Sequence, residues 1–220
     1  DSLGRIFIAD LDAKIIHIYN SQGSNIGKLG GEGVGPDEFS YIKNLYIRNG
    51  YLYAIDSNFG IRKSVKFNLN ELDKYHTTSL ARNRKNYKDL KLAYFGIYKI
   101  YVLSDDTYLA EFVVQETLPT KDWQNVELNG FLYFIDQQGN IKSNSFYDFQ
   151  EAIIVKKSKG LNTPIRPFFG TPFIETSSTN EIYISDPQLF LIRRFDSDGN
   201  YKGSFHYPIK KVPLTQESAM

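Results

Sequence analysis

An internal repeat is the feature of this sequence that most constrains its fold. Three segments align, and in each an apolar strand ends in Asp, a short loop follows, and a second alternating strand ends in Asn or Asp before a turn. The segments are RIFIADLDAKIIHIYNSQG from Arg5, YLYAIDSNFGIRKSVKFNLN from Tyr51 and EIYISDPQLFLIRRFDSDG from Glu181. In the first and last copies the turn residue comes ten residues after the strand-ending Asp, and a Gly comes three residues after the turn residue (Asp10, Asn20 and Gly23; Asp186, Asp196 and Gly199). Such self-similarity indicates an architecture built from one stacked unit.

A fourth, looser copy is GFLYFIDQQGNIKSNSF at 130–146, in which Asp136 and Gly139 take the turn positions. Two further strands, YKIYVL and YLAEFVV, are predicted before it, with a long loop at about 116–126. Each unit therefore has four strands, and an Asp/Asn-x-x-Gly turn joins the last two, since Asp or Asn caps the reversal and Gly accepts a positive φ.

Four-stranded antiparallel units that repeat about every 40 to 50 residues are typical of β-propeller blades. The sequence predicts an all-β fold, a β-propeller of four-stranded antiparallel blades. We expect one domain over residues 1–220, with blades at approximately 1–30, 40–78, 90–147 and 165–206.

The glycine-rich stretch GEGVGPDEF at 31–39 is predicted to be the crossover between two blades. It fits neither phosphate-binding motif, because Gly35-Pro36-Asp37 stands where a P-loop needs Gly-Lys-Ser/Thr, and no glycines have the G-x-G-x-x-G spacing. Its acidic residues would also repel a phosphate. We expect Phe39 to anchor the crossover between the blades.

GGEGVGPDEF followed by LYAIDSNFGIRKSVKF resembles the NHL-repeat propellers. Together with the expanded third copy and NEIYISDPQLFLIRRFDSDGNYKGSF running into KKVPLT, it looks most like the bacterial "6-bladed β-propeller" proteins, which are common in Bacteroidetes and often exported as lipoproteins. This resemblance covers nearly the whole chain and implies a fold, but no catalytic residue. It also implies a periplasmic, outer-membrane-associated or extracellular location, with membrane attachment only through a lipid anchor outside this chain.

Length and composition bound the remaining possibilities. Six blades need on the order of 280 residues, whereas this chain has 220 and four recognisable copies, so we expect a fragment of a longer protein rather than a ring of four or five blades. The absence of Cys excludes disulfides, thiolate nucleophiles and Cys-based zinc sites. A net charge of +1 gives little steering toward nucleic acid or an anionic membrane.

Two alternative functions remain open at this point. The strand-ending acids Asp10, Asp56 and Asp186 could converge on a divalent cation in the central channel of a hydrolase or lyase, although their recurrence favours a structural task, holding backbone N–H groups of their own loops. The run ARNRKNYKDLK at 81–91, with Arg82, Arg84 and Lys85, could bind RNA, although a solvated linker is the favoured interpretation. The three His residues are scattered without metal-ligand spacing.

The favoured function is a non-enzymatic binding or scaffold module of the bacterial cell envelope that contacts a protein or glycan. We expect a monomer, no nucleic-acid partner and no cofactor, with a divalent cation as the alternative. Contact residues are predicted mainly in the loops that join second and third strands, because these loops share one rim of a propeller. The candidates are Asp12, Asn58, Phe59, Trp123, Arg166 and Gln188.

Overall fold

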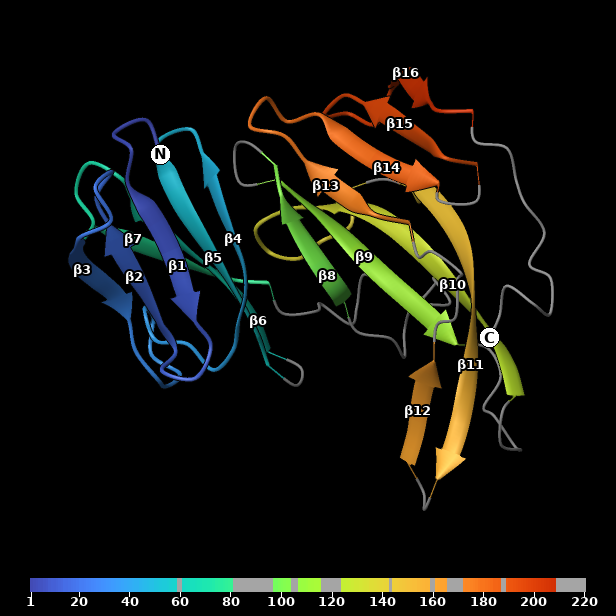
Figure 1. Cartoon of the computed structure of the whole chain (residues 1–220), viewed down its shortest axis with the longest axis horizontal. Coiled ribbons are helices and arrows are strands. Elements are labelled where there is room, and N and C mark those ends of the chain that lie inside the picture. Colours follow the sequence, from blue (N-terminus) through green and yellow to red (C-terminus); the bar gives the residue numbers. More distant parts are fainter. Residues whose placement is uncertain are drawn as a thin grey trace, which may run out of the picture. The chain divides into compact units, whose positions relative to one another are not determined.

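The computed structural model confirms an all-β chain (Figure 1). It describes residues 1–58, 61–80, 97–103, 107–115, 124–142, 144–158, 161–165, 172–186 and 189–208, and every regular element in these ranges is a β-strand. No helix in the described ranges is long and apolar enough to cross a membrane. The chain divides into two compact units, one comprising Asp1–Thr117 and Leu128–Gln150, the other Leu118–Glu127 and Glu151–Met220.

The strands pair with their neighbours in sequence, as the repeat predicted, and form four sheets. The first sheet contains β1 (Ile6–Asp10), β2 (Ile15–Tyr19) and β3 (Asn25–Gly30). The second contains β4 (Ile42–Arg48), β5 (Tyr51–Asn58), β6 (Ile61–Asn68) and β7 (Tyr75–Ser79). The third contains β8 (Ile97–Val102), β9 (Tyr108–Gln115), β10 (Gln124–Ile135), β11 (Tyr147–Ser158) and β12 (Leu161–Ile165). The fourth contains β13 (Ile174–Thr176), β14 (Ile182–Asp186), β15 (Leu191–Phe195) and β16 (Tyr201–His206).

The third sheet extends further along the chain than the predicted blade. The prediction ended that blade at 147, where β11 begins, but the sheet continues through β12 to Ile165. β11 and β12 pair from Ile154↔Ile165 to Ser158↔Leu161. No Asp/Asn-x-x-Gly signature marks this hairpin, so the repeat pattern gave no sign of it.

The predicted turns are present. In the third sheet Gly139 N donates to Asp136 O at 3.0 Å, and Gly139 has a φ of 74°. The first and last sheets have equivalent bonds, from Gly23 N to Asn20 O at 3.0 Å and from Gly199 N to Asp196 O at 3.1 Å. Each turn therefore uses Gly where the backbone needs a positive φ.

Within the first compact unit the core lies between successive sheets, and β5 is buried on both faces. Along β5, Leu52 and Ala54 belong to one cluster with Phe39, while Tyr53 and Ile55 belong to another that includes side chains of β8 and β9. The first sheet is covered on one face only. Phe7 and Ala9 of β1 pack against the first cluster, whereas Ile6 and Ile8 are 51% and 50% exposed.

The crossover at 31–39 has the predicted structural task. Phe39 is fully buried in the cluster shared by the first two sheets, and its backbone N donates to Gly31 O at 2.7 Å. The side chain of Glu38 turns back and accepts from Gly35 N at 2.8 Å. Gly30, at a φ of 80°, lies so close to Phe39 that an added Cβ would come within 2.3 Å of Cε2. The prediction of a crossover anchored by Phe39 is confirmed.

Candidate functional site

Asp10 and Asp186 bind backbone groups of their own loops, which was the structural interpretation of the recurring strand-ending acids. Asp10 Oδ1 accepts from Asp12 N at 3.0 Å and from Ala13 N at 2.9 Å. The bond from Ala13 N is the largest cause that holds the pKa of Asp10 below its ordinary value. Asp186 Oδ1 accepts from Leu189 N at 3.1 Å, and Arg193 Nη1 lies 3.3 Å from its other oxygen.

Asp56 differs from the prediction, because it is buried and binds backbone N–H groups of the loop before β4 instead of those of its own loop. Its carboxylate accepts from Tyr41 N at 2.7 Å and Ser40 N at 3.2 Å, and so joins the end of β5 to the chain that enters β4. Lys63 Nζ lies 3.9 Å from the same carboxylate and donates to the carbonyls of Gly35, at 2.7 Å, and Glu38. Asp56 is 3% exposed and Lys63 7%. This buried pair, called the crossover lock below, ties the glycine-rich crossover to the second sheet.

Among the described residues, no group of three or more His, Asp or Glu side chains is arranged to hold a metal ion. The absence of a cofactor stays a prediction. His17 of β2 is half-buried, with Nε2 3.7 Å from Asp10 Oδ2 and Nδ1 3.3 Å from the Asn25 amide.

Most of the predicted contact residues lie outside the described residues: Phe59, Trp123, Arg166 and Gln188, together with the basic run at 81–91. Of the others, Asp12 is exposed in the β1–β2 loop, where its backbone N donates to Asp10. Asn58 is the last residue of β5. Their role in ligand contact stays a prediction.

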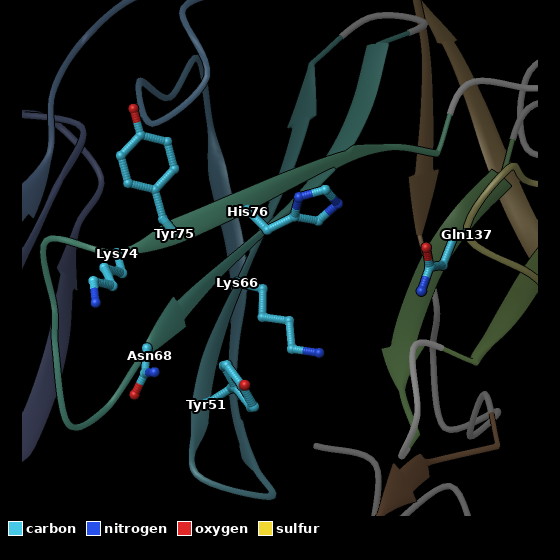
Figure 2. A pocket seen from close by; sticks show the side chains of 7 residues that line it. All are labelled: Tyr51, Lys66, Asn68, Lys74, Tyr75, His76 and Gln137. Carbon is cyan, nitrogen blue, oxygen red and sulfur yellow. The ribbon is translucent and has the colours of Figure 1, made fainter.

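A cavity of about 320 Å³ opens on the second sheet, and sequence reasoning did not single out its lining (Figure 2). The lining residues are Tyr51, Lys66, Asn68, Lys74, Tyr75, His76 and Gln137. All but Gln137 come from β5, β6, β7 and the turn between β6 and β7. Gln137 comes from the turn after β10, within the same compact unit.

Strand register brings these side chains together. Tyr51 pairs with Asn68, Tyr53 with Lys66, and Lys66 with His76. Directly paired residues of an antiparallel ladder project from the same face, so Tyr51, Lys66 and His76 share one face of the sheet. In Figure 2, Lys66 and His76 extend toward the side where Gln137 lies, whereas Tyr75 projects away from them. Tyr75 packs instead on Phe67, with ring centroids 5.9 Å apart.

Aromatic rings position the ammonium group of the cavity. Lys66 Nζ lies 4.3 Å from the ring centroid of Tyr51 and 5.3 Å from that of Tyr53, which is 2% exposed. Cation–π contacts of this kind hold a lysine head group in place without neutralising its charge. Lys74, the other lysine of the lining, forms an ion pair with Glu71.

The cavity and Asn58, one of the predicted contact residues, lie at opposite ends of the second sheet. Asn58 pairs with Ile61 at one end of the β5–β6 ladder, and Tyr51 pairs with Asn68 at the other, about 23 Å away along the strand. One feature of the sequence could have indicated the cavity at this end of the sheet. Gln137 follows Asp136, which occupies in the third copy the turn position that Asn68 occupies in the second, so both side chains come from equivalent turns.

The chain repeats antiparallel sheets of consecutive strands, and the sheets of the first compact unit pack face to face through apolar clusters, as the blades of a β-propeller do. A family model described as 6-bladed beta-propeller matches residues 1–205, and the chain belongs to this family.

Solved structures similar to this chain include a Bacteroides fragilis protein whose description infers export, with 11% identity over 93% of this chain and 68% of that one, and a TM-score of 0.40. The Dos1 propeller has 11% identity over 94% of this chain and 56% of that one, with a TM-score of 0.39. Apo AztD from Citrobacter koseri has 9% identity over 93% of this chain and 81% of that one, with a TM-score of 0.30. No curated protein sequence matches the chain.

Proposed function

We propose that this chain is a non-enzymatic binding or scaffold propeller of the bacterial cell envelope that contacts a protein or glycan through one rim. The observation that carries the proposal is the cavity at the Tyr51–Asn68 end of the second sheet. It gathers two ammonium groups, an imidazole, two carboxamides and two phenol groups on strands and their turns. Concave sites with a few convergent polar groups are where proteins bind small ligands or single units of larger ones.

The use of the strand-ending acids supports a binding role over a metal-centred one. In all three copies these carboxylates accept hydrogen bonds from backbone N–H groups. A repeated structural task accounts for their recurrence without a catalytic role. The cell-envelope location rests on the sequence resemblance to bacterial propellers that are often lipoproteins. It is tested by fractionating the source bacterium and probing each fraction with an antibody; a cytoplasmic protein would contradict it.

The binding role is tested on glycan and peptide arrays, with each hit confirmed by calorimetric titration of the purified chain. We expect saturable binding with a dissociation constant on the order of micromolar, near −8 kcal/mol. The absence of saturable binding to any glycan or peptide would overturn the proposal.

Two sets of variants identify the rim that makes the contact. One set changes Lys66 and His76 in the cavity, and the other changes Asp12 and Trp123 among the predicted contact loops. Loss of binding in the first set alone assigns the contact to the cavity, and loss in the second set alone assigns it to the loops. Neutralising Arg82, Arg84 and Lys85 tests the RNA alternative, which requires steep salt dependence of binding.

A further inference from the structure

We infer that the first sheet takes a fourth strand, formed by residues that directly precede Asp1 in the natural protein. This strand pairs antiparallel with β1, which lies at an edge of the sheet. The inference is independent of the proposed binding function. It follows from a turn at residues 1–5, from the order of the strands and from two half-exposed isoleucines.

Residues 1–5 form a hairpin turn. Gly4 N donates to Asp1 O at 3.0 Å, and Asp1 N donates to Arg5 O at 2.9 Å. Asp1 Oδ1 caps the turn by accepting from Leu3 N at 3.0 Å and from Arg5 N at 2.9 Å, and Gly4 has a φ of 73°. An Asp-capped reversal with Gly at a positive φ joins two adjacent antiparallel strands. β1 is the strand that follows this turn.

The same turn joins two strands in the fourth sheet. At residues 177–181, Asn180 N donates to Ser177 O at 3.1 Å, and Ser177 N donates to Glu181 O at 2.9 Å. Ser177 Oγ accepts from Thr179 N at 3.3 Å and from Glu181 N at 3.1 Å. This turn connects β13 with β14, and β14 is the strand that aligns with β1 in the repeat. The turn at residues 1–5 therefore lies where a strand equivalent to β13 leads into β1.

The strand order leaves room for this strand. β13 pairs with β14 in the fourth sheet and β4 pairs with β5 in the second, whereas in the described part of the first sheet β1 has only β2 beside it. Backbone groups along a strand point alternately to its two edges, so those of Phe7 and Ala9 point to the same edge as Arg5 O. In the fourth sheet, Ser185 aligns with Ala9, and its N donates to Phe173 O at 2.8 Å. An edge of this kind is a template for another strand.

The register of the fourth sheet predicts how the strand pairs with β1. Thr176 and Ile174 are the first and the third residue before the turn at 177–181, and they pair with Ile182 and Ile184. All four side chains are buried. Directly paired residues project from one face of the sheet, where neighbouring side chains cover one another.

Two isoleucines of β1 occupy the corresponding positions. Ile6 and Ile8 align with Ile182 and Ile184, but they are half exposed. By the same register, the first and the third residue before Asp1 pair with Ile6 and Ile8 and project from the same face. We expect apolar or β-branched side chains at these two positions, because they would cover the isoleucines from the side of the open edge.

The turn also indicates which strand pairs with β1. A strand of a second copy could pair with an open edge, but it would not account for a closed turn at residues 1–5. The bond from Asp1 N to Arg5 O holds Asp1 beside the start of β1. The residues before Asp1 therefore enter the turn next to β1 and run antiparallel to it.

The test is residue-resolved hydrogen exchange, measured by nuclear magnetic resonance on the 220-residue chain and on the natural protein with the residues that precede Asp1. We expect the amides of Phe7 and Ala9 to exchange at least about tenfold more slowly in the natural protein, because they gain strand hydrogen bonds. The amides of Ile6 and Ile8, which point toward β2, are the internal control and are expected to be protected in both proteins.

A variant of the natural protein identifies the strand. Replacing the residues before Asp1 by a Gly/Ser segment of equal length is expected to abolish the protection of Phe7 and Ala9, since such a segment stays flexible. Retained protection in this variant would overturn the inference, as would equally fast exchange of these amides in the natural protein and in the 220-residue chain. Protection already present in the 220-residue chain and lost on dilution would assign the edge to a second copy and overturn it too. A mature natural protein that starts at Asp1, found by N-terminal sequencing, would also overturn it.

Discussion

Replacing Asp56 by Ala tests whether the crossover lock stabilises the first compact unit. The substitution removes the acceptor of Ser40 N and Tyr41 N and leaves the ammonium of Lys63, which is 7% exposed, without its carboxylate. Asp10→Ala is the matched control in the same unit, since Asp10 also accepts from two backbone N–H groups, but its side chain is 40% exposed. The two variants therefore differ mainly in burial and in the paired lysine.

The expected magnitude follows from the burial of the pair. Removing one partner of a buried ion pair costs about 3–5 kcal/mol, because the other charge stays buried without compensation. Lys63 keeps its bonds to the carbonyls of Gly35 and Glu38, so we expect the low end, about 3 kcal/mol. For a domain of this size that lowers the melting temperature by about 6–12 °C. Asp10→Ala is expected to lower it clearly less.

The assay is thermal unfolding followed by far-ultraviolet circular dichroism, with urea unfolding to obtain the free energy. A double substitution, Asp56→Ala with Lys63→Met, is expected to recover part of the loss, because it removes the uncompensated charge as well as its partner. If Asp56→Ala lowers the free energy of unfolding no more than Asp10→Ala does, the buried pair adds no stability and the argument for the crossover lock is wrong.

Three further predictions concern the crossover, a turn and metal ions. Gly30→Ala is expected to destabilise the chain more than Gly23→Ala in thermal melts, because both glycines have a φ of 80° but only at Gly30 would the new Cβ meet the Phe39 ring; equal effects would contradict this packing. Burial opposes ionisation of Asp136, but hydrogen bonds from the Asn140 side chain and from backbone N–H groups outweigh it and hold its pKa below the ordinary 3.8. The native chain should therefore exceed Asp136→Asn in free energy of unfolding, measured in urea, by a constant amount above pH 3.8. This difference should shrink as the pH falls through the lower pKa that Asp136 has in the folded chain, and a difference that does not depend on pH would refute the argument. Treatment with EDTA and then with Ca²⁺, Mg²⁺, Mn²⁺ or Zn²⁺ is expected to leave the melting temperature unchanged. A bound cation at about a thousand times its dissociation constant would stabilise the chain by about 4 kcal/mol. A rise in melting temperature with one of these ions would therefore favour the metal-dependent hydrolase or lyase.

Local sequence determined the repeated sheets of this protein. The own-loop bonds of Asp10 and Asp186, the Asp/Asn-x-x-Gly turns and the crossover that ends in Phe39 were predicted, and the structure confirms them. The loops and turns depend on residues a few positions apart, because a turn needs its capping oxygen and its glycine within one reversal of the chain.

The candidate site required the tertiary structure. Lys66 and His76 are ten residues apart in sequence and meet only through the β6–β7 register, while Gln137 joins them from a different sheet of the same unit. The burial of the strand-ending acids could not be predicted from the sequence either. Asp10 and Asp56 end strands that align in the repeat, but of these two only Asp56 is buried beside a lysine. The sequence specifies which side chains each strand carries, whereas non-local pairing and packing decide which of them share a cavity and which lose contact with water.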